Sequence, residues 1–563
     1  MIKKIILIWW FIAFLLLNVT SQEVWYKKTA IYQIYPRSFY DTNGDGIGDI
    51  KGIIEKLDYI QELGFQAIWI SPFFSSPQKD FGYDISDYYN IAPEYGTMQD
   101  CEKLIEEAHK HNLKIIFDLV MNHTSEEHEW FKASSSSKEN DKANWYVWKD
   151  GKGRKGKRKP NNWKAMIGGS GWHWHEGREQ FYWSSFLPFQ PDLNYHNPEV
   201  KQAMLNVAKY WLQKGVDGFR LDIFNAIYED ESMKNNPFSF KIVPSESNPN
   251  GFFQKAKYNI NHEKSFQFAT ELRQVIDSFQ NPKRYLIGEV FGDNETLKKF
   301  CNYNGKDGLN TVFLFKTLTE KFKAKPYQKM IAEFEKDFSE PFTPVYVYSN
   351  HDRKRSISRL NESVEKAKLL AMFQFTVRGI PYTYYGEEIG MTQSYIPLKK
   401  GLDPLAQRFK RIPQFLVNMS SESINRDECR TPMQWTTEKN AGFTTGTPWL
   451  PVNENYIETN VKSAFSNDNS LLNFYRKTLK VRSHINALQT GTLEIDTNKC
   501  TKRIVAYYRI ANEEKYLVLL NMSKKQVTVS NISGKVLLST HGNNNAVETT
   551  MRPYEGRIVK VSE

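Results

Sequence analysis

The hydrophobic and polar positions between residues 30 and 390 follow two alternating periods. Short β-type runs, of which "AIYQIYPRSF" (30–39) and "AIWISPF" (67–73) come first, predict strands. Segments such as "DCEKLIEEAHKHNL" (100–113) and "PEVKQAMLNVAKYWLQKG" (198–215) carry apolar residues at helical spacing. Strands separated by amphipathic helices are typical of an α/β fold.

Counting the strand candidates narrows the fold. After the first two runs, the chain offers "KIIFDLVMNH" (114–123), "GFRLDIF" (218–224), "RYLIGEVF" (284–291), "NTVFLF" (310–315), "PVYVYSN" (344–350) and "IPYTYYGEEIG" (380–390). Eight strands separated by helices predict a (β/α)₈ TIM barrel.

Two regions depart from this alternation. Residues 124–190 are rich in Trp, Gly, Lys and Asn without a clear helix, which predicts an irregular subdomain inserted after strand 3. From residue 487 short strands follow at close spacing, which predicts a C-terminal antiparallel β-sandwich domain over 487–563. The barrel is then expected in two parts, 22–123 and 191–486.

The first 21 residues have the pattern of a secretory signal peptide. Two lysines precede an apolar run from Ile5 to about Leu17, and small residues follow, with cleavage expected after Ser21. The apolar run is shorter than a membrane-spanning helix requires, although an uncleaved anchor stays open as the alternative. We therefore expect a secreted protein, extracellular or in the lumen of the secretory pathway, with no stable membrane span.

The net charge of +11 does not indicate a nucleic-acid partner. Much of it lies in the run "KDGKGRKGKRKP" (149–160), which is rich in glycine and lacks interleaved aromatic residues, so we expect a solvated loop. The cysteines Cys101, Cys301, Cys429 and Cys500 are too widely spaced for a metal knuckle, and one or two disulfides are conceivable in a secreted chain. Sequons at Asn361, Asn521 and Asn531 would allow glycosylation in a eukaryotic host.

The stretch "DTNGDGIGD" (41–49) places oxygen-bearing side chains at every second position. Asp41, Asn43 and Asp45 in a glycine-rich loop mimic the start of an EF-hand, whose twelfth residue would be a bidentate glutamate. Here the twelfth residue is Gly52, and the preceding segment alternates like a strand. The loop is therefore not an EF-hand, and it directly follows the first barrel strand.

Carboxylates recur where strands of the predicted barrel end. Asp118, Asp222 and Glu289 each close an apolar run, and Asp352 follows another. In a TIM barrel this end carries the active site, and a carboxylate inside an apolar strand is costly unless it is paired or functional. One such residue could be a structural ion pair, but four on different strands indicate a catalytic site.

The neighbours of two of these carboxylates suggest different protonation states. Arg220 and Asp222 are two residues apart on a strand and so share a face, where the guanidinium should lower the Asp222 pKa. Glu289 has no cation beside it in sequence, so burial should raise its pKa. An anion opposite a protonated acid is the pair that retaining glycoside hydrolysis uses.

The motifs that contain these residues resemble a known family. "DLVMNH" (118–123), "GFRLDIFNA" (218–226), "GEV" (288–290) and "SNHD" (349–352) are similar, in order and spacing, to the four signature regions of the α-amylase family of glycoside hydrolases (family 13). "QPDLN" (190–194) resembles a further family motif. "GYDISDYYNI" (82–91), "RTPMQW" (430–435) and "AGFTTGTPWLPVNENY" (441–456) resemble the oligo-1,6-glucosidase, dextran glucosidase and α-glucosidase branch.

This resemblance implies roles residue by residue. Asp222 would be the nucleophile, Glu289 the general acid/base, and Asp352 the third carboxylate that grips the sugar. His123 and His351 would hydrogen-bond the glucose, while Asp84 and Arg430 would form a charged pair that holds its terminal hydroxyls. The implied activity is a retaining, exo-acting α-glucosidase on short α-glucosides of the maltose, isomaltose or sucrose type.

The resemblance also implies a structural ion and leaves alternatives open. One Ca²⁺ or Mg²⁺ would be bound by Asp41, Asn43, Asp45, the Ile47 carbonyl and Asp49, with no organic cofactor; the competing interpretation is an Asn/Gly turn without an ion. Ile223, after the nucleophile, is bulky, which resembles branch members active on α-1,6 bonds more than those that prefer α-1,4 bonds. Transglucosylation or sucrose isomerisation at the same site is the alternative activity. A non-catalytic, transporter-associated heavy chain is remote because all three carboxylates are present.

Overall fold

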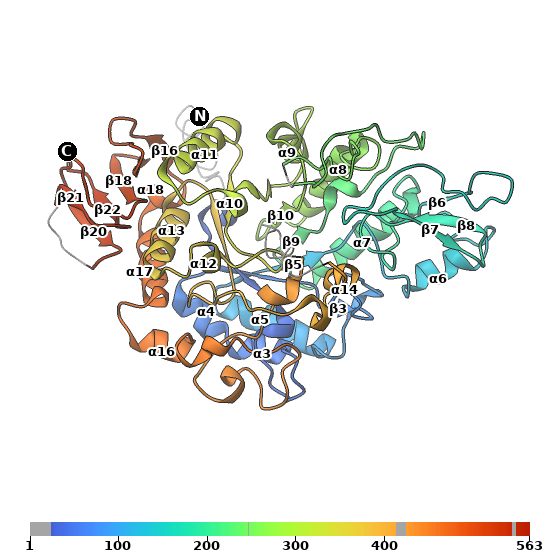
Figure 1. Ribbon diagram of the computed structural model, residues 1–563, viewed down its shortest axis with the longest axis horizontal. Coiled ribbons are helices and arrows are strands. Elements are labelled where there is room, and N and C mark those ends of the chain that lie inside the picture. The colour runs from blue at the N-terminus through green and yellow to red at the C-terminus, as the bar shows by residue number, and fades with distance from the viewer. Residues whose placement is uncertain (1–23, 246, 413–423, 543–547, 563) are drawn as a thin grey trace, which may run out of the picture.

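The computed structural model, which describes residues 24–245, 247–412, 424–542 and 548–562, has eight parallel strands at its centre (Figure 1). Their hydrogen-bonded order is β13-β10-β9-β5-β2-β1-β15-β14, which curves into a nearly closed barrel and confirms the predicted fold class. The strands are β1 (Ile31–Ile34), β2 (Ala67–Ile70), β5 (Lys114–Leu119), β9 (Gly218–Leu221), β10 (Tyr285–Gly288), β13 (Thr311–Val312), β14 (Val345–Val347) and β15 (Ile380–Tyr384). Each lies within one of the apolar runs identified above.

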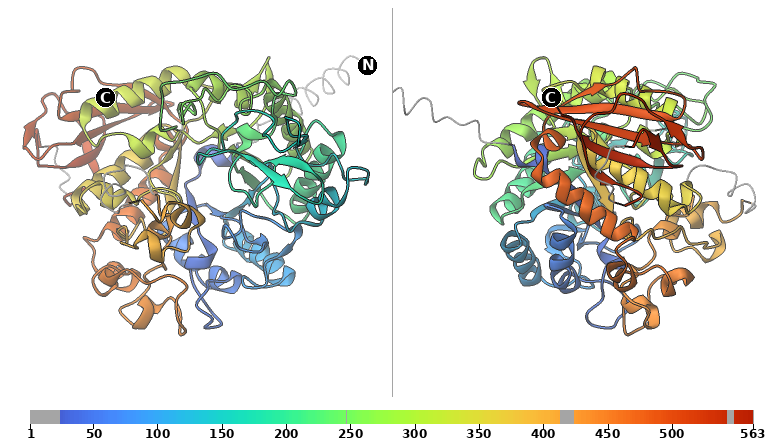
Figure 2. Two further views of the ribbon diagram at one scale, coloured as in Figure 1. Left: turned by 45° about the vertical axis from the view of Figure 1, so that its right-hand side comes forward. Right: turned by 90° about the vertical axis from the view of Figure 1, so that its left-hand side faces the viewer.

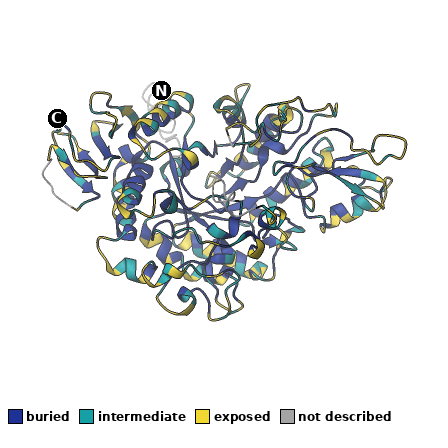
Figure 3. Ribbon diagram, in the orientation of Figure 1, coloured by how far each residue is buried: buried dark blue, intermediate teal, exposed yellow. Residues whose placement is uncertain are grey.

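Helices surround this barrel, as Figure 2 shows from two further directions. They are α3 (Ile50–Glu55), α4 (Leu57–Leu63), α5 (Met98–Lys110), α7 (Pro198–Gln213), α8 (Glu263–Asp277), α9 (Asn294–Cys301), α11 (Ala324–Asp337), α13 (Val364–Thr376) and α17 (Leu471–His484). Helix α5 illustrates the local logic: Thr97 and Asp100 form a capping box, and Cys101, Leu104, Ile105 and Ala108 form its buried face. The eight barrel strands are buried along their length except at Lys114, the first residue of β5 (Figure 3).

The inserted subdomain is more regular than the sequence pattern predicts. It contains the helix α6 (Glu129–Ser136) and a three-stranded antiparallel sheet of β6 (Trp148–Lys149), β8 (Gln180–Trp183) and β7 (Trp172–His175). Its tryptophans 163, 172 and 183 pack on one another in a cluster of their own. The expectation of no helix here was wrong, since a single two-turn helix followed by short aromatic strands leaves little periodic signal.

A second excursion follows β9 and was not predicted. Residues 227–262 run from the short 3-10 helix η2 (Phe224–Ala226) to α8, and the part of this segment that the structure describes (227–245 and 247–262) contains no further helix. Reciprocal hydrogen bonds tie this excursion to the inserted subdomain: Asn162 Nδ2 donates to the Asn236 carbonyl at 2.9 Å, and Asn236 N donates to Asn162 Oδ1 at 2.8 Å. The inserted subdomain and the excursion are thus joined into one wall at the carboxyl ends of the barrel strands.

The C-terminal region is an antiparallel β domain, as predicted. Five strands pair in the order β16 (Thr492–Ile495), β17 (Ile504–Ala511), β18 (Glu514–Asn521), β22 (Gly556–Lys560) and β20 (Lys535–Ser539). A second sheet of β19 (Val527–Thr528) and β21 (Thr550–Met551) packs on it through Val529 and Met551, which meet Ile504, Leu517 and Val559. The domain lies beside α13 and α17, at the upper left of Figure 1.

Several smaller expectations can be compared with the described residues. The predicted signal peptide, residues 1–21, lies outside them, and within them no helix is long and apolar enough to cross a membrane. All four cysteines are free, so the conceivable disulfides are not formed. Asn521 is buried and donates to the carbonyls of Lys525 and Arg552, which leaves no room for a glycan there, whereas Asn361 and Asn531 are exposed. The basic run of residues 149–160 is largely exposed.

Candidate active site

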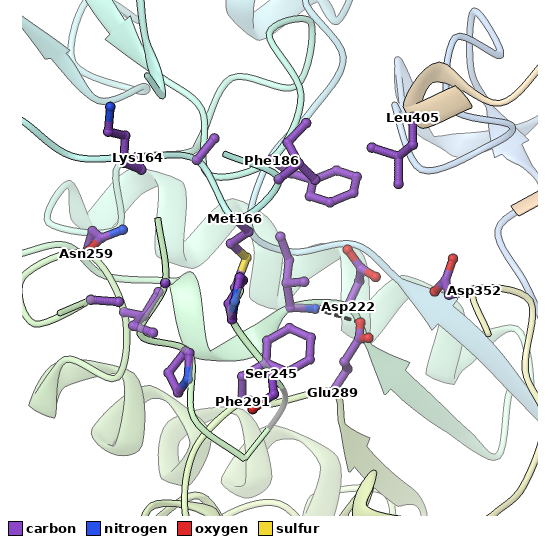
Figure 4. Close-up of a pocket in the computed structure, with 18 of the residues that line it drawn as sticks. Lys164, Met166, Phe186, Asp222, Ser245, Asn259, Glu289, Phe291, Asp352 and Leu405 are labelled. Carbon is purple, nitrogen blue, oxygen red and sulfur yellow. Dashed lines mark hydrogen bonds between the residues drawn. The ribbon is translucent and has the colours of Figure 1, made fainter. Parts of the chain in front are cut away.

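A pocket with a volume of about 280 Å³ opens at the carboxyl ends of the barrel strands (Figure 4). Its floor carries Asp222, which follows β9, Glu289, which follows β10, and Asp352, which comes after β14. In Figure 4 the side chains of Asp222 and Glu289 point toward each other, with Asp352 beside them. The barrel therefore brings together the three carboxylates singled out from the sequence.

Arg220 lies beneath this group and links it. Its Nη1 is 2.7 Å from Asp222 Oδ1 and 2.8 Å from Asp118 Oδ1, and its Nη2 is 2.6 Å from Glu289 Oε2. The guanidinium is 2% exposed, so its charge is little screened by water. One buried cation thus holds three carboxylates in a fixed arrangement, with Asp118 further anchored by Trp69 Nε1 and the Tyr83 hydroxyl.

The pKa values of the two facing carboxyl groups differ. Burial raises the pKa of Asp222 to about 6, although Arg220 acts to lower it. Burial raises the pKa of Glu289 to about 8, and the charges of Asp222 and Asp352 act in the same direction. The predicted direction for Glu289 is confirmed. The prediction for Asp222 was wrong, because loss of water outweighs the neighbouring guanidinium. At neutral pH the pair still consists of an anion, Asp222, and an acid, Glu289.

Asp352 is held as an anion by a different set of groups. Its Oδ1 is 2.8 Å from Arg430 Nη2 and 3.4 Å from Arg426 Nη1, and its Oδ2 is 3.2 Å from His351 Nε2. Burial opposes the charged form, but His351 and the two guanidinium groups hold the Asp352 pKa well below its usual range. A fixed negative charge therefore faces the pocket.

The two predicted histidines are neutral. Burial lowers the pKa of His123 to about 4 and that of His351 well below its usual value. Gln33 Nε2 lies 2.8 Å from His351 Nδ1, so His351 carries its proton on Nε2, which faces Asp352 and the Tyr83 hydroxyl. His123 lines the pocket directly, with its Nε2 3.1 Å from the Tyr83 carbonyl.

The expected pair of Asp84 and Arg430 is not formed. Asp84 accepts hydrogen bonds from Ser76 Oγ and from the backbone N–H groups of Lys79 and Asp80, so it shapes the turn before β4 (Asp87–Ile91). Asp80 lines the pocket in its place and is 2.5 Å from Arg426 Nη2. The assignment of Asp84 was wrong because sequence similarity locates the loop but not which of its two aspartates faces inward.

Other pocket residues were missed because they lie far from the signature motifs. Arg426 bridges Asp80, Asp403 and Asp352, and it stands in a segment without strand or helix periodicity. The outer wall comes from the inserted subdomain, the excursion after β9 and the helix α14 (Pro404–Phe409): Met166, Phe186, Phe252, Ile260 and Leu405. Phe291 and Phe315 complete the apolar side next to Ile223. Only the aromatic richness of these segments signalled a role.

The predicted ion loop offers oxygen atoms that could bind a cation, but here these oxygens accept hydrogen bonds from backbone N–H groups in successive turns. Asp41 Oδ1 accepts from the N–H groups of Asn43 and Gly44, Asn43 Oδ1 from Asp45 N, and Asp45 Oδ1 from Ile47 N. Asp49 caps α3 through Gly52 N. The possible metal ligands are all oxygen atoms, which a hard cation prefers. Among the described residues, however, no three His, Cys, Asp or Glu side chains come together as a metal site, so the ion stays a prediction.

Comparison with known proteins identifies the family of this chain. Residues 33–491 match the model of the α-amylase catalytic domain. The chain is 37% identical to an oligo-1,6-glucosidase of Parageobacillus thermoglucosidasius, with 96% of this chain and 99% of that protein aligned. It is 38% identical to a probable α-glucosidase of Rhizobium meliloti, over 90% of each chain. The crystal structure of an isomaltulose synthase mutant from Erwinia rhapontici with sucrose superposes with a TM-score of 0.84 at 32% identity, covering 95% of this chain and 99% of that one.

The family match begins within β1 and extends past β15, so all the candidate site residues of the pocket floor lie within the matched range. The fold, the order of the motifs and the geometry of the pocket floor lead to the same assignment. The chain belongs to the α-amylase family of glycoside hydrolases (family 13).

Proposed function

We propose that this protein is a retaining, exo-acting α-glucosidase that releases glucose from the non-reducing ends of short α-glucosides. The observation that carries the proposal is the placement of Asp222 and Glu289 on two nitrogens of one guanidinium, at 2.7 and 2.6 Å. Such closeness favours the spacing of retaining enzymes over the wider gap that inverting enzymes leave for a water molecule. The relatives named above support the substrate class.

The proposed reaction has two steps. The ionised Asp222 attacks the anomeric carbon and forms a covalent glucosyl ester, while Glu289 gives its proton to the departing glycosidic oxygen. Glu289, now ionised, takes a proton from water, which attacks the same carbon and releases Asp222 and glucose. Asp352 provides a fixed anion beside the sugar as positive charge develops at the ring.

The exo mode is supported by the inner end of the pocket. Arg426 joins Asp80, Asp403 and Asp352 there through contacts of 2.5, 2.8 and 3.4 Å, and Arg430 joins Asp352 from behind. These buried ion pairs are costly to separate because each remaining charge would be left unpaired. A sugar chain could therefore not continue past the terminal glucose.

Glucosyl transfer, including sucrose isomerisation, is the second candidate. The side of the pocket away from the ion pairs is lined by Ile223, Phe291 and Phe315, with the two phenylalanine rings 6.0 Å apart. An apolar surface there would hold a second sugar and limit access of water to the glucosyl ester. The structural likeness to an isomaltulose synthase favours the same possibility.

Product analysis with maltose, isomaltose, sucrose and trehalose tests the proposal and separates the two candidates. We expect glucose as the main product, with β-branched Ile223 favouring isomaltose or sucrose over maltose. Isomeric disaccharides as the main products from sucrose would replace hydrolysis by isomerisation. No turnover of any of the four sugars would refute the proposed function.

We further propose that the chain is secreted and that one Ca²⁺ or Mg²⁺ braces the loop of residues 41–49. The N-terminal pattern supports the first statement and the all-oxygen donor set supports the second. N-terminal sequencing of the mature protein tests cleavage after Ser21. Melting with and without a chelator tests the brace, since indifference to chelator would favour an empty turn.

A further inference from the structure

Two buried carboxyl groups meet outside the catalytic pocket, at the seam between the inserted subdomain and the excursion after β9. Asp192 belongs to "QPDLN" and is 1% exposed, and Glu229 follows η2 and is 2% exposed. Their side chains are in hydrogen-bonding contact. Among the described residues, no lysine, arginine or histidine forms an ion pair with either of them.

One oxygen of each group lacks a donor. Ser185 N donates to Asp192 Oδ1 at 2.8 Å, but Asp192 Oδ2 and Glu229 Oε1 have no partner. Two ionised carboxylates cannot satisfy each other, because both only accept hydrogen bonds and their charges repel in a buried site. A single proton would remove the repulsion and satisfy both oxygens.

We propose that Asp192 and Glu229 share one proton, and that this acid pair positions Asn122 and His123 at the edge of the pocket. Asn122 hydrogen-bonds Asp192 and lies 3.4 Å from His123 Nδ1 through its Nδ2. The backbone follows the same path: Leu193 N donates to the Asn122 carbonyl at 2.9 Å, and His123 and Asp192 form a β-bridge. Asp192 and Glu229 are positioning residues, since neither lines the pocket.

The other titratable groups at this seam leave the shared proton in place. His123 is neutral, and it faces the pair only through Asn122 and the backbone. His196 Nε2 donates to the backbone carbonyl of Glu229, while its Nδ1 faces Glu231 and Lys264. Neither imidazole contacts the Glu229 or Asp192 carboxyl group, and the other side chains that hydrogen-bond the pair, Ser185, Asn122 and Trp183, are neutral.

The decisive variants are Glu229→Gln and Asp192→Asn, whose amides can donate where the proton was. Folding retains a proton that the unfolded chain releases, so the wild-type unfolding constant should rise with pH by about tenfold per unit between roughly pH 5 and 7 from this group alone. Each variant should remove that contribution while keeping the fold. Glu231→Gln, which removes an exposed carboxyl two residues away, should leave the slope unchanged.

Infrared difference spectra supply a second readout without substrate. The wild type minus Glu229→Gln spectrum should contain the carbonyl band of a protonated carboxylic acid, and wild type minus Glu231→Gln should not. Absence of this band together with an unchanged pH slope would overturn the proposal. Asn122 Oδ1 also lacks a donor, so three unpaired oxygens could bind a cation in place of the proton. The number of calcium ions bound per chain is therefore measured as well. Loss of one ion in Glu229→Gln would show that a cation, not a proton, holds the pair.

The positioning role, which rests on the proposed function, is tested by kinetics on the preferred α-glucoside. Glu229→Ala leaves Asp192 Oδ2 without a donor and should raise KM about tenfold or more, with a smaller change in kcat, whereas Glu229→Gln should restore the wild-type KM. Equal KM values in all three proteins would refute the positioning role while leaving the spectroscopic result to stand. Absence of turnover in the wild type would instead refute the proposed function.

Discussion

The chemistry depends on a few buried side chains whose charge states are set by their surroundings. Asp222 and Glu289 share Arg220, yet burial separates their pKa values to about 6 and about 8. Arg430, Arg426 and His351 hold the Asp352 pKa well below its usual range, so Asp352 stays ionised at neutral pH. At neutral pH the floor of the pocket therefore contains two anions, Asp222 and Asp352, and one acid, Glu289.

Replacing the proposed nucleophile should stop turnover without unfolding the protein. Asp222→Asn keeps the shape of the side chain but cannot form the ester, so kcat should fall by roughly four orders of magnitude or more, the scale seen when a catalytic nucleophile is removed. Glucose release and circular dichroism measure the two effects. Asp277→Asn, which alters a half-exposed carboxylate on α8, is the control. Appreciable activity in Asp222→Asn would refute the nucleophile assignment.

The pH dependence of kcat/KM should be bell-shaped. Asp222 must be ionised, so activity should be lost as the pH falls through about 6. Glu289 must be protonated, so activity should also be lost as the pH rises through about 8. Because the two groups interact, both limbs belong to the pair rather than to single residues. Rates measured from pH 4 to 10 on the preferred sugar test this, and activity that keeps rising above pH 9 would contradict it.

Loops and short elements, rather than the barrel strands, give the site its walls. Asp49 is both the last residue of the loop 41–49 and the N-cap of α3. Its Oδ1 accepts a hydrogen bond from Gly52 N, and its Oδ2 accepts hydrogen bonds from the backbone N–H and the hydroxyl of Thr42. The excursion of residues 227–262 is held to the inserted subdomain by amide side chains. Side-chain hydrogen bonds thus help to position both elements, and the excursion contributes residues to the lining of the pocket.

Removing the cap should weaken the first loop. Asp49→Ala deletes the hydrogen bonds to Gly52 and Thr42, and losing an N-cap costs about 0.5–2 kcal/mol of the free energy of unfolding. Denaturation in urea with a chelator present isolates this effect from any bound ion. Lys51→Ala, an exposed change on the same helix, should have almost no effect. Equal stability of the two variants would argue against the cap.

Loosening the wall should affect substrate use more than stability. Asn162→Ala removes both reciprocal hydrogen bonds to Asn236, each contributing about 1 kcal/mol. If the wall must be ordered to hold the second sugar, kcat/KM should fall roughly tenfold, mainly through KM. Asn144→Ala, at an exposed position in the same subdomain, is the matched control. An unchanged KM would show that the wall does not contact the substrate.

At the scale of the whole molecule, the barrel and the C-terminal β domain share one hydrophobic core. Tyr507 and Val518 of the β domain belong to the same cluster as Phe373 and Phe375 of α13. Arg509 is fully buried at this junction and donates to the carbonyls of Leu488 and Gly491 at 3.0 and 2.8 Å. The β domain is therefore packed against the barrel and contributes to its stability.

Arg509→Ala should destabilise the entire chain. The change leaves buried carbonyl groups without donors, at about 1–3 kcal/mol each, so the loss should reach several kcal/mol. Calorimetry should show one transition at lower temperature, with kcat unchanged in the folded protein. Lys502→Ala, on the exposed end of the same region, should melt like the wild type. Two separate transitions would contradict a shared core.

The sequence by itself determined the barrel, the β domain and the chemical identity of the site. Apolar runs and helical faces repeat with fixed periods, and carboxylates at strand ends stand out because burial there is costly. Asp118, Asp222, Glu289 and Asp352 were found by that signal alone. Local patterns suffice where each residue's environment follows from its own element.

Only the tertiary structure decided which distant groups meet. Glu289 has no cationic residue beside it in the sequence, yet in the folded chain the Arg220 guanidinium lies against its carboxyl group. Asp80, not Asp84, faces Arg426. The pKa of Asp222 is raised by burial, which the residues next to it in the sequence do not indicate. Contacts across hundreds of residues and the exclusion of water are properties of the folded chain, because both depend on how its elements pack.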